Sequence, residues 1–191
     1  MGKTIIFDTE TTGIPIMNGY NCYHSPHLFE YYKDARLIEL GYLIFDENNQ
    51  LIKKKNHLIK PDGFIIENTH IHGISHEMAM TNGQPIQCII DELYNDLEDV
   101  DTIVSHNIKF DINILLSECF GLCNTHIIAK IIDMEKQCTM RMGKQFINSK
   151  KNPKLTELYE HLFQKECKQT HRALSDAEYC AECYLHMIKE I

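Results

Sequence analysis

Two carboxylates stand side by side near the start of the chain, in the stretch IIFDTETTG at residues 5–13. An apolar run ends there in Asp8 and Glu10, with only Thr9 between them. Residues i and i+2 of a β-strand lie on the same face, so the two acids are predicted to be neighbours in space. Adjacent anions repel each other, which indicates that a cation or a set of strong donors holds them.

Acids recur at two later positions, where an α/β fold ends its strands and begins its helices. Asp111 lies in SHNIKFD, after a strand predicted to end at Ser105, and Asp176 lies in HRALSDA at the start of the last predicted helix. Each has an ordinary interpretation by itself: Asp176 as a first-turn acid favoured by the helix dipole, and Asp111 as a solvated helix acid. His171, taken alone, is a surface histidine. The combination with the first pair of acids favours a functional site.

The stretches FDTETTG, HNIKFD and HRALSDA resemble, in this order, the three exonuclease motifs of the DEDDh family of 3′-to-5′ exonucleases. The resemblance runs from about Ile5 to Cys180, nearly the whole chain. It implies a ribonuclease H-like fold and a catalytic site with two divalent cations, Mg²⁺ or Mn²⁺. It also implies a role for each motif residue: the metal-binding catalytic acids are Asp8, Glu10, Asp111 and Asp176, and the general base is His171.

Substrate-binding residues follow from the same resemblance. Thr11 and Asn107 lie within the first and second motifs, and His72 lies in IHGIS, which resembles a family turn near the terminal nucleotide. Each is expected to contact the 3′ end of the substrate.

The chemistry of phosphodiester hydrolysis agrees with this set of residues. Cleavage adds charge to an anionic phosphate, and two divalent cations about 4 Å apart stabilise both the attacking and the leaving oxygen. Mg²⁺ and Mn²⁺ prefer oxygen ligands, which explains a set of acids without cysteine. His171 and Asp176 are separated by about 140° on a regular helix, so His171 is predicted to lie just ahead of the helix. Imidazole titrates near neutral pH, so this side chain is suited to accept a proton from the attacking water.

The elements that must position these residues follow from the apolar periodicity. Strands are predicted at residues 3–8, 36–46 and 50–59, with a turn at Asn48 and Asn49, so that the first strands form an antiparallel meander. Later elements alternate: helices are predicted at 85–98, 110–120, 155–163 and 173–191, and strands at 101–105 and 127–133. This order predicts an α/β domain with a mixed sheet, antiparallel at first and then parallel, flanked by helices.

Length and composition limit the class of protein. The chain of 191 residues, with 43% hydrophobic and 24% charged residues, is predicted to form one domain over residues 1–191. No apolar segment is long enough to span a membrane, and no secretion signal is apparent, so we expect a soluble intracellular protein, cytoplasmic or nuclear. The net charge of −8 argues against coating long duplex DNA by phosphate neutralisation alone.

Eight cysteines leave a structural zinc site as an alternative. The pairs Cys119/Cys123 and Cys180/Cys183 have a spacing similar to zinc ligands, but each falls in a helical pattern where cysteine packs as a small apolar residue. Without a secretion signal, reduced thiols are the preferred interpretation.

Two segments have both a structural and a functional interpretation. An insertion at about residues 14–35 either stacks aromatic rings on unpaired bases or packs a long loop on the sheet edge; its aromatic residues are Tyr20, Tyr23, Phe29, Tyr31 and Tyr32. A basic run without an acid is either a solvated loop or a guide for the phosphate backbone; its residues are Arg141, Lys144, Lys150, Lys151 and Lys154. In the functional interpretation Lys150, Lys151 and Lys154 bind substrate.

The sequence therefore predicts a metal-dependent 3′-to-5′ exonuclease that acts on single-stranded 3′ ends of DNA or RNA and releases nucleoside 5′-monophosphates. A polymerase or another replication or repair protein is a possible partner. The alternative is a catalytically silent module on the same fold that binds nucleic acid or a polymerase. The presence of all four acids and the histidine argues against it, since a silent relative does not need them.

Overall fold

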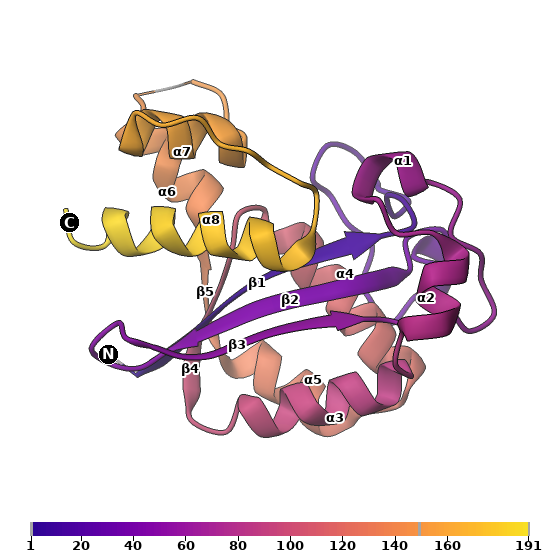
Figure 1. Cartoon of the computed structure of the whole chain (residues 1–191). Helices are drawn as coiled ribbons and strands as arrows, with labels where there is room; N and C mark the ends of the chain where they lie inside the picture. The colour runs from indigo at the N-terminus through magenta and orange to yellow at the C-terminus, as the bar shows by residue number, and fades with distance from the viewer. Residues whose placement is uncertain (1, 149, 191) are drawn as a thin grey trace.

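A five-stranded sheet is the centre of the molecule, in a computed structural model that describes residues 2–148 and 150–190 (Figure 1). Its strand order is β3-β2-β1-β4-β5. The elements in chain order are β1 (Lys3–Thr11), η1 (Phe29–Tyr31), β2 (Leu37–Phe45), β3 (Leu51–Leu58), α1 (Thr69–His72), α2 (His76–Asn82), α3 (Ile86–Asp96), β4 (Val100–Ser105), α4 (Ile108–Gly121), α5 (Thr125–Asp133), β5 (Glu135–Cys138), α6 (Thr139–Phe146), α7 (Leu155–Phe163) and α8 (Ala173–Met187).

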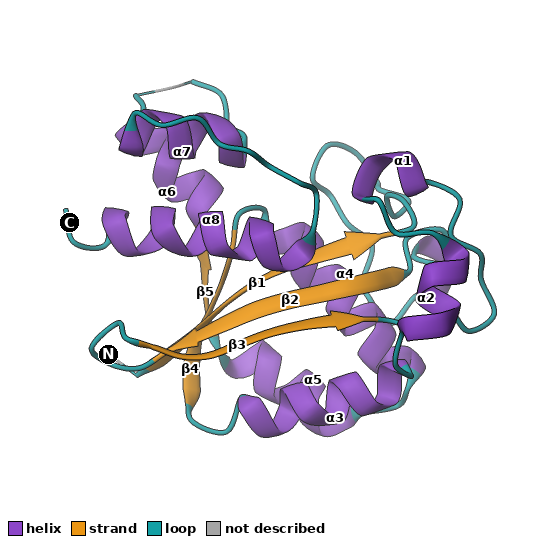
Figure 2. Cartoon of the chain, in the orientation of Figure 1, coloured by secondary structure: helices purple, strands orange, loops and turns teal. Residues whose placement is uncertain are grey.

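The sheet is mixed, as the sequence predicts. Strand β2 pairs antiparallel with both β1 and β3, whereas β4 pairs parallel with β1 and with β5 (Figure 2). The β2–β3 turn is closed by the Asp46 carboxylate, which accepts the backbone N–H groups of Asn48 and Gln50, while Asn49 adopts a left-handed φ of 60°. Asparagine tolerates this conformation better than most residues, so the predicted turn has a local cause.

Helices cover the two faces of the sheet, and the alternation along β1 assigns its side chains to one layer or the other. Ile5 and Phe7 pack in the core formed with α3, α4 and α5. Ile6 packs in a second core with α7 and α8, and Figure 1 shows α8 crossing this face. Continuing the alternation, Asp8 and Glu10 belong to the α8 face.

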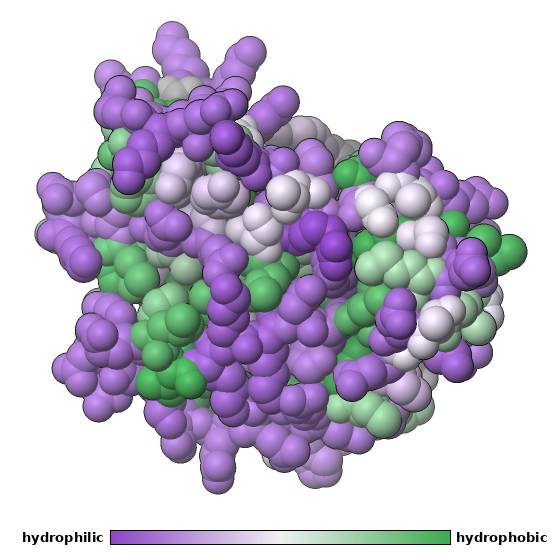
Figure 3. All heavy atoms as spheres, in the orientation of Figure 1, coloured by the Kyte–Doolittle hydropathy of each residue, from purple (hydrophilic) through white to green (hydrophobic). Residues whose placement is uncertain are grey.

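Strand β3 is an edge strand, and it carries three consecutive lysines. Lys54 pairs with Glu178 of α8, while Lys53 and Lys55 pair with Asp96 of α3. Charged side chains on an edge strand oppose pairing with another chain. Figure 3 shows that hydrophilic residues cover most of this face of the molecule.

The predicted strand at 127–133 is wrong, because these residues belong to helix α5. Ile127, Ile128 and Ile131 are buried together on one side of the helix, and the side chain of Asn124 caps its N-terminus. Isoleucine favours strands in isolation, but the helical spacing and the cap decide this segment. The parallel strand follows immediately afterwards as β5.

The other long helices agree with the prediction to within a few residues, although α4 begins two residues earlier than expected. Helix α8 ends at Met187, and the predicted end at Ile191 lies outside the described residues. Helices α1, α2 and α6 are not anticipated by the sequence analysis. In the described part of the chain, no helix has the length and apolar character required to cross a bilayer.

The cysteine pairs are packed as small apolar residues or left at the surface. Cys180 and Cys183 are buried within α8, Cys119 is buried in α4, and Cys123 is exposed just after it. Among the described residues, the one group of three or more side chains placed to hold a metal contains carboxylates and no cysteine. The structure gives the zinc alternative no support.

Candidate active site

Asp8 and Glu10 are neighbours at the end of β1, on the face that α8 covers. In the register of the sheet, Asp8 is opposite Gly41 of β2 and Glu10 is opposite Glu39. A Cβ atom on Gly41 would lie 2.2 Å from the backbone nitrogen of Leu174, so the first turn of α8 crosses β2 at a place where only glycine fits. This close crossing brings the beginning of α8 to the two acids.

Asp176, in the first turn of α8, completes a cluster of three carboxylates. Oxygen atoms of Asp8, Glu10 and Asp176 all lie within 4.8 Å of one another. One Asp176 oxygen accepts a hydrogen bond of 2.6 Å from the Gln169 side chain, whereas its buried Oδ1 has no partner among the described residues. Buried charge without donors is costly, so this oxygen is suited to bind a cation.

The pKa values of the clustered acids also favour a cation at this position. Burial, followed by repulsion from Asp111 and Asp176, raises the pKa of Asp8 well above its usual range. Burial and then repulsion from Asp176 and Glu39 raise the pKa of Glu10 to about 8. Burial also raises the pKa of Asp176. Each shift means that the negative charge is destabilised here, and a divalent cation would reverse that effect.

Asp111 lies in the first turn of α4, on the opposite side of the sheet from α8. Its two oxygens accept hydrogen bonds from the hydroxyl groups of Thr9, at 2.7 Å, and Ser105, at 2.6 Å. Burial raises the pKa of Asp111 to about 6, although the Ser105 and Thr9 hydroxyls act to lower it. Asp111 is therefore close enough to repel Asp8 but is not one of the three clustered carboxylates.

His171 lies ahead of α8, at the position predicted from its spacing to Asp176. Its φ of 50° is in the left-handed region, which is uncommon for a residue other than glycine. The next residue, Arg172, donates hydrogen bonds from Nε and Nη2 to the Glu39 carboxylate, and Ala173 donates its backbone N–H to the same carboxylate at 3.0 Å. The Arg172–Glu39 pair thus fixes the backbone on the α8 side of the histidine.

Glu39 is fully buried, with 0% of its surface exposed. Although burial acts to raise the pKa of Glu39, hydrogen bonds from Arg172 and Asn56 hold it below its ordinary value. A buried carboxylate with several donors remains charged and holds those donors in fixed positions. Glu39 gives no signal in the sequence, because its partner Arg172 is more than 130 positions away.

A cleft of about 650 Å³ brings the four acids and His171 together. Its walls contain the four predicted acids and His171, together with the predicted substrate residues Asn107 and Lys154. Tyr20 of the aromatic insertion also lines the cleft, and the remaining lining residues are Thr9, His106, Phe110, Met140, Asn152, Pro153, Leu155, Thr156 and Gln169.

His106 holds one wall of this cleft in place. Its Nε2 atom donates to the carbonyl oxygen of Pro153 at 3.0 Å, and its Nδ1 atom accepts from the hydroxyl of Thr139 at 3.0 Å. Burial lowers the pKa of His106 to about 4, so the ring is neutral at physiological pH. The segment that carries Asn152 and Lys154 is thereby attached to the second motif.

Four predicted substrate residues lie outside the lining of the cleft. The Thr11 hydroxyl donates to the carbonyl of Gly13 at 2.7 Å. His72 is 2% exposed, and its Nδ1 accepts the backbone N–H of Ile74 at 3.1 Å. Lys150 and Lys151 are exposed on the loop before Lys154. The Thr11 hydroxyl and the His72 ring are therefore hydrogen-bonded to nearby backbone groups, which the motif pattern does not show.

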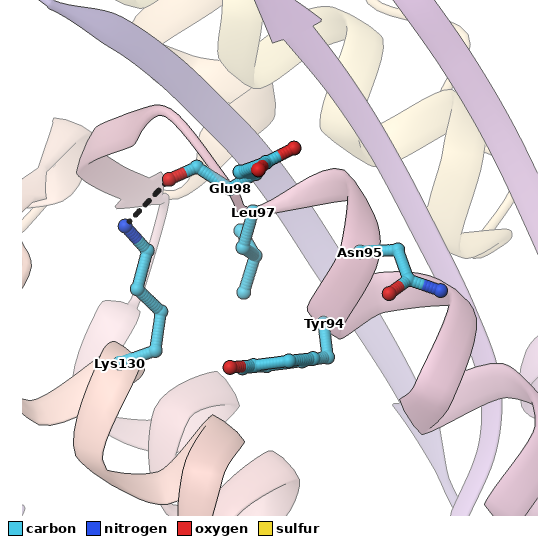
Figure 4. A pocket seen from close by; sticks show the side chains of 5 residues that line it. All are labelled: Tyr94, Asn95, Leu97, Glu98 and Lys130. Atoms are coloured by element: carbon cyan, nitrogen blue, oxygen red, sulfur yellow. Dashed lines mark hydrogen bonds between the residues drawn. The ribbon is translucent and has the colours of Figure 1, made fainter.

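A second hollow, of about 280 Å³, lies on the opposite layer between α3 and α5 (Figure 4). It is lined by Tyr94, Asn95, Leu97, Glu98 and Lys130, and the Lys130 amine donates to the backbone carbonyl of Glu98 at 3.2 Å. This pocket has no clustered carboxylates. The larger cleft, which contains the three clustered carboxylates, is therefore the candidate active site.

Comparisons with known proteins agree with this geometry. A family model described as Exonuclease, RNase_T, matches residues 5–184. Exonuclease I of E. coli in complex with a dA16 oligonucleotide superimposes with a TM-score of 0.67 at 16% identity, over 100% of this chain and 41% of that one. A moderately thermophilic Exonuclease I from Methylocaldum szegediense gives a TM-score of 0.68 at 15% identity, with the same coverage of 100% and 41%.

A structure described as an ExoI/SSB-Ct complex is similar too, with a TM-score of 0.67 at 15% identity over 100% of this chain and 41% of that chain. This chain therefore spans about two fifths of the length of these solved relatives, and the likeness establishes the fold. Among curated proteins, none matches the sequence. The ribonuclease H-like fold and the family resemblance predicted from the sequence are confirmed.

Proposed function

The chain belongs to the exonuclease family whose model spans residues 5–184, and we propose that it is a metal-dependent 3′-to-5′ exonuclease of the DEDDh type. In this proposal it hydrolyses phosphodiester bonds at the 3′ end of DNA or RNA and releases nucleoside 5′-monophosphates. The observation that carries the proposal is the group of three carboxylates within 4.8 Å of one another.

Asp8, Glu10 and Asp176 are proposed to hold divalent cations, Mg²⁺ or Mn²⁺, with Asp111 as the fourth acid of a two-metal site. When bound, such cations stabilise the charge that develops on the attacking and leaving oxygens of the phosphate. The raised pKa values of Asp8 and Glu10 and the unpartnered oxygen of Asp176 support this role. All four acids use hard oxygen donors, which suits these ions.

His171 is proposed to accept the proton of the attacking water. It lines the cleft beside the acids, on a backbone that Arg172 and Glu39 hold in a fixed conformation. A base held in place in this way loses little orientational freedom when the substrate binds. The role is distinct from metal binding, because a base contributes to the transition state far more than to substrate binding.

The proposed substrate is a single-stranded 3′ end, with Asn107 and Lys154 contacting the sugar and phosphate groups. The solved relatives include complexes of E. coli Exonuclease I with a dA16 oligonucleotide and a complex described as ExoI/SSB-Ct. A similar oligonucleotide substrate, and a protein partner in replication or repair, are proposals for this chain.

The test is a nuclease assay on strands labelled at the 5′ end or at the 3′ end, as single-stranded DNA, duplex DNA and RNA, with Mg²⁺ or Mn²⁺. Nucleoside 5′-monophosphates released first from the 3′ end are the expected products, and chelation should stop the reaction. Asp8→Ala, purified in the same way, excludes a contaminating nuclease, and Asp62→Ala is an exposed control. If the wild type binds the strands but cleaves none of them with either metal, the alternative of a silent binding module is correct.

A further inference from the structure

The insertion at residues 14–35 folds into a small hairpin beside the active site. Met17 and Tyr23 form an antiparallel bridge, and the backbone N–H of Asn18 donates to the carbonyl of Cys22 at 2.8 Å. The tip turns through left-handed residues: Gly19 has φ 113° and Asn21 has φ 52°. The residue between them is Tyr20, so the hairpin of residues 17–23 presents this tyrosine at its tip.

Packing of the following residues fixes the base of this hairpin. Tyr32 is 1% exposed, and its hydroxyl donates to the carbonyl of His24. The ring of His24 stacks on the ring of Tyr31, with centroids 3.6 Å apart. Ile16 donates its backbone N–H to the carbonyl of Tyr31 at 2.8 Å, which ties the other side of the insertion to the same place. The hairpin is therefore attached on both sides.

The five aromatic residues of the insertion consequently have different roles. Tyr31 and Tyr32 hold the base of the hairpin, Tyr23 is half-buried, and Phe29 lies under the Arg36 guanidinium at 5.1 Å. Tyr20 is 89% exposed, and no ring contact within the described part of the chain involves it. A large aromatic ring that is exposed to water contributes little to the stability of the fold.

The position of Tyr20 indicates what its ring is for. It lines the same cleft as Asp8, Asp176 and His171, at the side formed by the insertion. Aromatic rings in single-strand-binding proteins stack on nucleobases of any sequence, at about 1–3 kcal/mol per base. Because the hairpin backbone is already tied down at its base, stacking would order the tyrosine side chain and little else.

We propose that Tyr20 stacks on a nucleobase close to the 3′ end of an unpaired strand in the cleft, so that it determines a preference for single-stranded ends. The inference rests on the proposed exonuclease function. A base in an intact duplex is covered by its neighbours and its pairing partner, and it cannot receive the ring without being unstacked. Discrimination against duplex ends follows from this cost.

The experiment combines variants of the protein with abasic positions in the substrate. Tyr20→Ala should raise KM for a single strand by about 5- to 150-fold, which corresponds to one stacked base, whereas Tyr20→Phe should retain wild-type KM. Tyr94→Ala is the matched control, because Tyr94 is an exposed tyrosine that lines the distant pocket of Figure 4. It should leave KM unchanged.

A series of strands, each with one abasic site near the 3′ end, identifies the stacked base. At one position the wild type should lose as much as Tyr20→Ala loses on the intact strand, and the variant should lose nothing more. Equal KM for wild type and Tyr20→Ala on intact strands would overturn the inference, as would a penalty that persists at every abasic position. The same comparison by fluorescence anisotropy, with Asp8→Ala in both proteins, measures binding alone. If the wild type shows no hydrolysis, the proposed function fails, while the anisotropy still decides the role of Tyr20.

Discussion

Glu10→Gln should make the metal-free protein more stable at alkaline pH, because Glu10 is held as an anion beside other anions. Its pKa rises from an ordinary value of 4.5 to about 8 in the fold. A group with a raised folded pKa contributes stability below its unfolded pKa, and this stability is lost as the pH increases through the folded pKa. In chelator, the wild type should therefore lose stability as the pH rises from about 4.5 to about 8. The glutamine variant should not show this loss, because it has no carboxyl group at position 10 to ionise.

The magnitude follows from the two pKa values. Their difference corresponds to about 5 kcal/mol at 1.36 kcal/mol per pKa unit, and partial exposure of the side chain reduces the effective value by solvent screening. We expect Glu10→Gln to raise the free energy of unfolding by about 2 kcal/mol at alkaline pH in chelator, with the two proteins equal at acid pH. Saturating Mg²⁺ should reverse the order, because only the wild type keeps the full set of ligands.

Urea unfolding at several pH values, with chelator or with Mg²⁺, measures these differences. Glu47→Gln is the matched control, since Glu47 is exposed in the β2–β3 turn and far from the cleft. Equal stability of Glu10→Gln and Glu47→Gln at alkaline pH in chelator would refute the repulsion at Glu10. Equal stabilisation of Glu10→Gln and the wild type by Mg²⁺ would refute metal binding by Glu10.

Three other changes test the remaining parts of the site. His171→Ala should lower kcat by about 10²- to 10⁴-fold with little change in KM, and wild-type turnover from about pH 6 to about pH 9 would remove it from the mechanism. Gly41→Ala should lower the free energy of unfolding by about 3 kcal/mol, because the new Cβ atom would lie 2.2 Å from the α8 backbone. An unchanged midpoint of urea unfolding would contradict this close contact. The third change replaces Lys150, Lys151 and Lys154 of the basic run together by glutamine. It should raise KM for long strands and weaken the salt dependence of KM, with kcat unchanged. If KM and its salt dependence stay at wild-type values, the basic run is only solvated surface.

The adjacency of Asp8 and Glu10 could be predicted because it depends only on the two-residue period of a strand. The position of His171 ahead of α8 follows in the same way from helical geometry. The α/β class with a mixed sheet is confirmed for a similar reason, since turn residues and apolar periodicity are local signals. The division into one domain and the roles of the site residues stay predictions.

What the sequence could not supply depends on contacts between distant segments. Helix α5 was predicted as a strand because isoleucine is common in both structures, and its burial against the core is not visible locally. The close crossing of Gly41 with Leu174 and the pairing of Glu39 with Arg172 each join β2 to α8. The hydroxyl partners of Asp111 come from two neighbouring strands, so they too require the sheet order.

The candidate active site combines electrostatic repulsion among its acids with firm support from the surrounding structure. Three clustered carboxylates destabilise the fold, yet α8 is held against β2 by the pairing of half-buried Arg172 with buried Glu39 and by a backbone contact at Gly41. Both supports lie within one helical turn of the point where α8 presents Asp176. The acids are therefore kept close together by the fold itself, and a cation at this cluster would require little rearrangement of the backbone. Local conflicts of this kind, compensated by neighbouring contacts, are expected where function rather than stability determines the residues.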